Sequence, residues 1–347
     1  MKSSEQEKKY FINPYTNLKD IRKYGSLIIE KGRGIYVYDE NNNKYIEGLA
    51  GLWCVALGFN NKRLIKAANK QLNLLPNYHS FTGKVPLTTL KLSEELVKIS
   101  PKSLTKVLYA NSGSESNDTA IKMAWYYQNA LGRTKKKKII SRYRGYHGVT
   151  IMSGSLTGMD YAHKGFDMPR DFVVHTDSPH YYKDSLSQES SREFVNRLLK
   201  NLENLIIKEG ADNIAAMILE PIQGAGGVII PPDNYLKGVQ KLLKKNAILL
   251  IVDEVICGFG RTGNMFGCDT FQIKPDMMVI AKGLSSGYVP ISALLINEEI
   301  YETISDFSSI NNVFGHGYTY SGHPVAAAVA LETIKIFKDE NIIGHVK

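Results

Sequence analysis

The sequence predicts an α/β protein with a central, mainly parallel sheet flanked by helices. Strand-like and helix-like segments alternate through most of the 347 residues, which is the pattern of such proteins. Several strand segments are continuous apolar runs, as expected of strands that are covered on both faces. With 43% hydrophobic and 22% charged residues, the composition is that of a globular chain, long enough for a large core and about two domains.

The elements can be assigned in order from local patterns. Polar residues 40–43 favour a turn between two short strands, and apolar residues at helical spacing indicate the helices. Pro324 suits the first turn of the last helix. Strands are expected at 36–38, 44–46, 107–110, 138–141, 215–219, 247–252 and 277–281. Helices are expected at about 115–131, 191–208 and 324–337.

The net charge of +9 is spread along the chain, with one dense basic run from Arg133 to Lys138. This run follows a predicted helix, and cations suit a helix C-terminus, so we expect a solvated turn. A nucleic-acid-binding patch is the alternative. It is disfavoured because no aromatic residues alternate with the lysines.

The cysteines and the N-terminus bear on location. Cys54, Cys257 and Cys268 are widely spaced and form no CxxC pair, which argues against a disulfide framework and for reduced thiols. Residues 1–20 are polar, and no run approaches the roughly 20 apolar residues of a membrane span. We therefore expect a soluble, cytoplasmic protein.

Three charged residues directly follow predicted strands. Glu220, Asp253 and Lys282 end the apolar runs at 215–219, 247–252 and 277–281. Ligands of α/β proteins bind at the carboxyl ends of parallel strands. If these strands are neighbours, the two carboxylates and the amine meet at one edge of the sheet.

Lys282 has two interpretations. It either extends to solvent from the strand end or sits in a partly desolvated pocket, where its amine can form a Schiff base with an aldehyde. Taken alone, Asp253 is a cap or an ion-pair partner. Beside such a lysine, it is the acid that a pyridine nitrogen needs.

Two turns could complete a binding site. Gly113 and Ser114 lie where a strand leads into a helix, a place that suits an anion, although the same residues suit an ordinary helix cap. Tyr146 lies between glycines in a second turn, at Gly145–Gly148. Its ring could stack on a flat ligand or simply pack.

Two other kinds of site are disfavoured. Gly258–Gly263 fits the G-x-G-x-x-G pattern of dinucleotide binding, but residues 264–267 interrupt the helix that this pattern needs. His316 and His323 lie seven residues apart, without the cysteine or carboxylate spacing of a zinc site. We therefore expect no metal.

Five blocks, in this order along the chain, resemble class III aminotransferases: 111–119, 220–227, 252–263, 281–284 and 316–324. Further blocks at 51–54, 75–81, 177–181 and 263–268 are most similar to the branch that uses pyruvate and ω-amino acids, which includes 4-aminobutyrate transaminases. The resemblance implies fold type I of the pyridoxal 5'-phosphate (PLP) dependent transferases, with PLP as cofactor.

The resemblance also implies catalytic roles. Lys282 links covalently to PLP and then moves a proton between substrate and cofactor. Asp253 pairs with the pyridinium nitrogen. Glu220 is a carboxylate near the ring.

Further cofactor contacts follow from the resemblance. Gly113 and Ser114 hold the phosphate, Tyr146 stacks on one face of the ring, and Val255 covers the other face.

The remaining roles concern a partner and the substrate. Thr319 reaches the phosphate of a partner subunit, which implies a homodimer. Trp53 and Tyr78 line the substrate pocket.

The resemblance implies three parts of the chain. Residues 1–50 contribute to a small domain, residues 51–325 form the large PLP-binding domain, and residues 326–347 begin a helix toward a C-terminal small domain, partial in this sequence. The expected reaction moves an amino group from an ω-amino acid or amine, such as 4-aminobutyrate, to pyruvate or another 2-oxo acid. The alternatives are an inactive PLP-binding fragment and an aminomutase or decarboxylase of the same fold.

Overall fold

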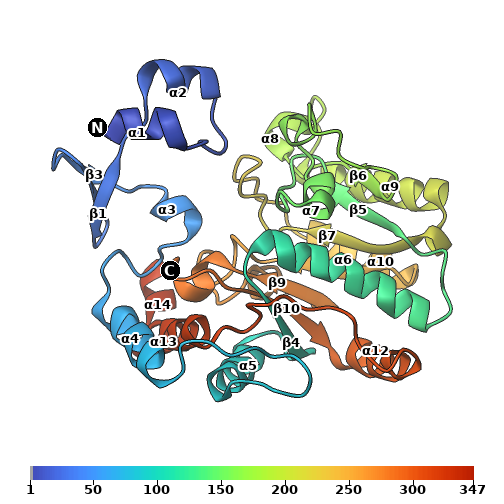
Figure 1. Cartoon of the computed structure of the whole chain (residues 1–347). Coiled ribbons are helices and arrows are strands. Elements are labelled where there is room, and N and C mark those ends of the chain that lie inside the picture. The colour runs from blue at the N-terminus through green and yellow to red at the C-terminus, as the bar shows by residue number, and fades with distance from the viewer. Residues whose placement is uncertain (1–2) are drawn as a thin grey trace.

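A seven-stranded sheet forms the centre of the molecule in the computed structural model, which describes residues 3–347 (Figure 1). The strand order is β4-β10-β9-β8-β7-β5-β6, and β10 runs antiparallel to both of its neighbours while the other pairs are parallel. The prediction of a mainly parallel sheet is therefore confirmed. The strands are β4 (Leu104–Ala110), β5 (Lys138–Arg142), β6 (Val173–Thr176), β7 (Ile214–Leu219), β8 (Leu249–Asp253), β9 (Met277–Ile280) and β10 (Ser292–Asn297).

Helices cover both faces of this sheet and enclose two apolar cores. One core packs α6, α7 and α12 against the strands, and the other packs α5, α9, α10 and α13. All six residues of β7 are buried, which explains why this strand reads as an unbroken apolar run. The helices are α5 (Leu87–Ile99), α6 (Gly113–Ala130), α7 (Ile151–Leu156), α9 (Ser191–Glu209), α10 (Tyr235–Lys245), α12 (Glu298–Ile310) and α13 (Pro324–Asp339).

The N-terminal residues form a separate small sheet that stands beside the main body (Figure 1). Its strands β1, β2 and β3 are antiparallel, and Tyr36 pairs with Ile46 across the predicted strand–turn–strand. The elements of this part are α1 (Ser3–Tyr10), α2 (Leu18–Tyr24), β1 (Ile29–Arg33), β2 (Tyr36–Asp39), β3 (Lys44–Ile46), α3 (Ala50–Trp53) and α4 (Lys62–Leu74). Three short helices lie elsewhere: α8 (Tyr181–Asp184), α11 (Gly267–Phe271) and α14 (Ile342–Val346).

The basic run after α6 differs from its prediction. Lys136 is only 3% exposed, and its Nζ donates to the carbonyls of Ala211, Ile214 and Ala247 at 2.8, 3.1 and 3.1 Å. The expectation of a solvated turn is wrong for this residue, because the ends of neighbouring elements leave three carbonyls that need a donor. Among the described helices, none is both long and apolar enough to cross a membrane.

Candidate active site

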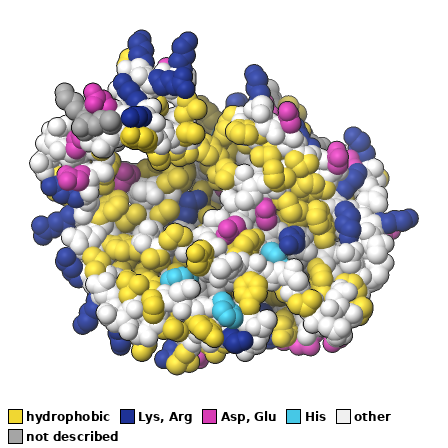
Figure 2. All heavy atoms as spheres, in the orientation of Figure 1, with side chains coloured by type: hydrophobic (Ala, Val, Ile, Leu, Met, Phe, Trp, Pro, Cys, Tyr) yellow, Lys and Arg dark blue, Asp and Glu magenta, His cyan; other side chains and the backbone are white. Residues whose placement is uncertain are grey.

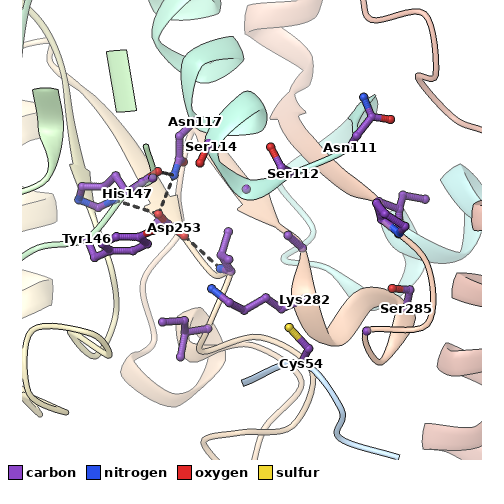
Figure 3. Close-up of a pocket in the computed structure, with 18 of the residues that line it drawn as sticks. Cys54, Asn111, Ser112, Ser114, Asn117, Tyr146, His147, Asp253, Lys282 and Ser285 are labelled. Atoms are coloured by element: carbon purple, nitrogen blue, oxygen red, sulfur yellow. Dashed lines mark hydrogen bonds and ion pairs between the residues drawn. The ribbon is translucent and has the colours of Figure 1, made fainter. Parts of the chain in front are cut away.

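Glu220, Asp253 and Lys282 lie together at one edge of the sheet, as their positions after predicted strands implied. They follow or end β7, β8 and β9, which are adjacent parallel strands. All three line a cavity of about 320 Å³ (Figure 3). The condition that these strands be neighbours is thus met.

The Asp253 carboxylate is buried and fixed by three donors. Asn117 Nδ2 and His147 Nδ1 lie 2.8 and 2.9 Å from its Oδ2, and the Val255 amide donates to Oδ1 at 3.1 Å. Figure 3 shows Asn117 from α6 and His147 from the turn after β5 converging on it. Since hydrogen bonds to a carboxylate are strong, this arrangement stabilises a negative charge that faces the cavity.

Lys282 combines a strained backbone with a perturbed amine. Its φ of 42° lies in the left-handed region, which non-glycine residues adopt at a cost and often at functional sites. Burial lowers the pKa of its amine, and the charges of Asp253, Cys54 and Glu220 oppose this effect. Cys54 lies beside its side chain in Figure 3. The amine can therefore act as a nucleophile or a base more readily than an exposed lysine.

Glu220 is a second buried carboxylate, only 3% exposed. It accepts hydrogen bonds from the amides of Tyr146 at 3.0 Å and Gly224 at 2.9 Å. Burial raises its pKa, which the charge of His147 partly offsets. This carboxyl thus both anchors the turn that carries Tyr146 and lines the cavity.

The turn before α6 is a helix N-terminus that opens on the cavity. Ser112 and Glu115 form a reciprocal capping box, so capping of the helix is part of the turn's role. A side chain at Gly113 would place Cβ 3.0 Å from Val255 Cγ2, which is closer than ordinary van der Waals contact, so glycine suits the close approach of these two segments. Ser114 Oγ accepts from the Val149 amide at 3.1 Å. Gly113, Ser114 and Val255 all line the cavity.

The Tyr146 ring also lines the cavity, and the N-terminal segment reaches it. Tyr15 Oη donates to Tyr146 Oη at 3.3 Å, and the two rings meet edge to face. Tyr15 also contacts Tyr161 edge to face. The N-terminal segment therefore contacts the tyrosine that is expected to stack on a ligand.

Three predicted site residues lie outside the cavity of the single chain. Trp53, Tyr78 and Thr319 do not line it. Trp53 ends the left-handed turn α3, and its carbonyl accepts from Arg261 Nη2 at 3.0 Å. Tyr78 and Thr319 are exposed. Their roles stay predictions.

No local sequence pattern predicts that Asn117 and His147 hold Asp253, or that Cys54 lines the cavity. His147 belongs to the Gly145–Gly148 turn, in which only Tyr146 is a predicted site residue. Asn117 lies one helical turn after Gly113 on α6, and this spacing on a helix that opens on a site is the signal that could have identified it.

Comparison with known proteins gives one consistent result. A profile described as "Aminotransferase class-III" matches residues 20–347. A probable gamma-aminobutyrate transaminase 3 of Oryza sativa subsp. indica is 53% identical over 92% of this chain and 63% of its own length. Gamma aminobutyrate transaminase 1 of Solanum lycopersicum is 54% identical over 92% of this chain and 62% of its own length.

Solved structures agree with the sequence relatives. The omega transaminase from Pseudomonas jessenii in complex with PMP has a TM-score of 0.98 and 51% identity, covering 99% of this chain and 76% of that one. The chain thus spans 63% and 62% of the length of these two plant relatives and 76% of the length of this solved relative. With its sheet, its strand-end lysine and acid, and these matches, the chain belongs to the class III aminotransferases.

Proposed function

We propose that this protein transfers an amino group from an ω-amino acid or amine to a 2-oxo acid such as pyruvate, with PLP as cofactor. One observation carries the proposal. The buried Asp253 carboxylate and the Lys282 amine face one cavity from adjacent strand ends. A pyridine ring that binds amines needs an acid and an amine in this relation.

The residues of the cavity fit PLP. Asp253 would hold the ring nitrogen, Gly113 and Ser114 would hold the phosphate at a helix N-terminus, and Tyr146 and Val255 would cover the ring. The narrow gap at Gly113, which a Cβ would fill, supports a backbone approach to the phosphate. When bound, PLP supplies an aldehyde that captures amines and a ring that accepts electrons.

The protein's own groups would position the substrate and move protons. The lowered pKa of Lys282 raises its neutral fraction, so its Nζ can remove a proton from the carbon next to the substrate nitrogen and return it. Asp253 would lie opposite, with its carboxylate fixed in place by Asn117 and His147. Glu220 adds a largely desolvated carboxyl near both groups.

The substrate class rests on the relatives. Relatives with nearly the same sequence identity to this chain, 53% and 52%, are named as a probable gamma-aminobutyrate transaminase and as a vanillin aminotransferase of Capsicum frutescens. Acceptance of 4-aminobutyrate with pyruvate is the first activity to test, with an aromatic amine as the second donor.

The first experiment measures cofactor binding. Purified protein freed of excess PLP should keep an absorbance band near the visible edge, and borohydride should fix the cofactor to the chain, whereas Lys282→Ala should form no such covalent link. A protein that binds no PLP would refute the proposal. Formation of an amino acid from pyruvate and 4-aminobutyrate then tests turnover.

A second candidate function is PLP binding without turnover. No arginine lines the cavity within residues 3–347, although a cation is the usual partner of a substrate carboxylate. A half-reaction with 4-aminobutyrate that converts the cofactor band but yields no product with pyruvate would support it. Product analysis would separate transamination from the aminomutase and decarboxylase reactions of the same fold.

We also propose that two copies assemble and that Thr319 of each contacts the phosphate held by the other. Thr319 is exposed and outside the cavity of its own chain. Hydrophobic side chains cover much of the surface around the hollow in Figure 2, as a buried interface requires. Trp53 and Tyr78 are proposed to line the substrate entrance in that assembly.

Two further proposals concern organisation and location. We divide the chain into residues 1–50, 51–325 and 326–347, and limited proteolysis near these boundaries tests this division. Location in the cytoplasm stays a prediction, because relatives are named mitochondrial or chloroplastic. Cell fractionation would decide it.

A further inference from the structure

The short turn α3, which precedes Cys54, winds in the left-handed direction. Its residues Ala50, Gly51, Leu52 and Trp53 have φ values of 50°, 55°, 69° and 60°. Glycine adopts this conformation freely, but each of the other three residues adopts it at a cost, because the side chain crowds the backbone. Left-handed residues normally occur singly, so contacts must stabilise four of them in a row.

Local hydrogen bonds close this turn but do not fix its place in the molecule. The Trp53 amide donates to the Leu49 carbonyl at 2.8 Å, and the Cys54 amide donates to the Ala50 carbonyl at 2.9 Å. Both bonds lie within the segment. Leu52 is 58% exposed, so burial of its side chain contributes little. The position of the turn therefore depends on contacts from other parts of the chain.

Arg261 provides such a contact. Its Nη2 donates to the Trp53 carbonyl at 3.0 Å, and its Nε donates to the Ile256 carbonyl at 2.7 Å. Because a guanidinium is planar and its donors point in fixed directions, these two bonds set how far apart the two carbonyls lie. Ile256 belongs to the loop that follows Asp253 and β8. Arg261 thus ties the strained turn to the loop after the buried acid.

The turn held in this way carries part of the cavity wall. Cys54 directly follows the turn and lines the cavity. Its side chain lies beside that of Lys282 in Figure 3, and a Cβ added at Gly287 would lie 2.9 Å from the Cys54 Cβ. Cys54 is therefore packed closely against the backbone that follows Lys282. Any movement of the turn would move this thiol relative to the amine.

We propose that Arg261 is a positioning residue that holds the left-handed turn, and with it Cys54, against the Lys282 side of the cavity, and thereby limits the size of the amines that reach Lys282. The first half rests on the hydrogen bonds, and the second half rests on the proposed function. Arg261 does not line the cavity, so it acts through the turn and not on the substrate. When the turn is released, Cys54 can move away from the amine, and bulky donors gain relative to small ones.

Labelling of thiols with iodoacetamide tests whether Arg261 holds the turn. Arg261→Met keeps a long side chain but removes both donors. It should raise the labelling rate of Cys54 in the full chain by about tenfold or more, because the lost hydrogen bonds no longer oppose local opening. Cys257 and Cys268 are only 2% and 1% exposed, so they report global unfolding and should stay unlabelled. Peptide mass analysis identifies each labelled thiol, with and without PLP.

Two further variants complete the labelling test. Arg261→Lys keeps the charge but lacks the planar fork, so it should give an intermediate rate. Arg192→Met, which changes an exposed arginine at the start of α9, is the matched control and should leave the rate unchanged. If Arg261→Met fails to fold, Arg261→Lys takes its place, and a rate equal to that of the parent then refutes the proposal.

Steady-state kinetics tests the consequence for the amino donor. In Arg261→Met, the ratio of kcat/KM for benzylamine to kcat/KM for 4-aminobutyrate should rise about fivefold or more, because the wall beside Lys282 is no longer fixed. A mere loss of folded enzyme would lower kcat for both donors equally and leave both KM values and this ratio unchanged.

Three results would overturn the proposal: an unchanged labelling rate of Cys54, equally accelerated labelling of all three cysteines, or an unchanged donor ratio in an active variant. Labelling of the chain without PLP tests the turn independently of the reaction. Faster labelling of Cys54 alone, in a protein whose parent shows no transamination, would refute the proposed function but confirm that Arg261 holds the turn.

Discussion

Asp253 and Glu254 are neighbours in the sequence and both are buried, but their carboxylates meet different surroundings. Successive residues at a strand end point to opposite faces, so Asp253 faces the cavity and Glu254 faces α11. Asp253 has a histidine, an asparagine and an amide as donors. Glu254 accepts from the amides of Gly267 at 2.9 Å and Cys268 at 2.6 Å. One carboxylate is thus arranged for a ligand, and the other holds a short helix.

His147→Phe should weaken PLP binding by about tenfold or more, because a hydrogen bond to a buried charge contributes about 1.5–3 kcal/mol. The ring of phenylalanine fills a similar volume but donates nothing to Asp253. Equilibrium titration of PLP measures the effect. His180→Gln, a histidine that does not line the cavity, is the control. An affinity equal to that of the parent would show that Asn117 alone suffices.

Glu254 should make stability depend on pH. Burial raises its pKa to about 7 from an ordinary 4.5. Since the folded state holds the proton more tightly, its stabilising contribution is complete below about pH 4.5 and is lost as pH rises through about 7. The total is about 3 kcal/mol. Urea unfolding between pH 5 and 8 should show this decline in the parent but not in Glu254→Gln; parallel curves would contradict it.

At the scale of elements, Lys136 connects segments that lie far apart in the sequence. Its amine joins the turn after α6 to the start of β7 and to the turn before β8 through three carbonyls. Burial lowers its pKa, but the three acceptors satisfy its donors. The side chain thus fixes the starting ends of two central strands.

Lys136→Met should lower the free energy of unfolding by about 1–3 kcal/mol, since it leaves buried carbonyls without a donor. Lys135→Met is the matched control. Because Lys135 is exposed, this change should alter the free energy of unfolding by less than about 0.5 kcal/mol. Chemical denaturation of both variants checks this. Equal effects would show that the three hydrogen bonds contribute little.

Elements with a strong local pattern could be predicted, whereas partners distant in sequence could not. The apolar runs before Glu220, Asp253 and Lys282 identified strands β7, β8 and β9, because strands buried on both faces need no polar residues. By contrast, β10 was missed, although it is apolar too. Asn117 and His147 act on a carboxylate 136 and 106 residues away, and no short-range pattern encodes such contacts.

At the scale of the whole molecule, the proposed assembly of two copies would complete the proposed site. Within one chain, Thr319 lies outside the cavity that its counterpart is proposed to complete. Cofactor retention should therefore depend on protein concentration.

Dilution below the dissociation constant of the assembly should release PLP, measured as loss of the absorbance band together with a fall in mass. Thr319→Ala should raise the PLP dissociation constant about tenfold without changing the mass, because it removes one phosphate contact. A cofactor affinity that is independent of concentration would contradict the shared site.

The pairing of β4 with β10 has a consequence for how the protein is made. Ala110 of β4 pairs with Ser292 of β10. Strand β4, which leads into the Ser112–Ser114 turn, can therefore form this pair only after most of the chain has been synthesised. During synthesis on a ribosome, β5 to β8 can associate first, while the edge of β4 that pairs with β10 has no partner strand. Such long-range closure is slow and exposes a strand edge. The Ser112–Ser114 turn, which is the proposed phosphate site, should thus be among the last regions to reach its folded structure, and the nascent chain should depend on chaperones until β10 emerges.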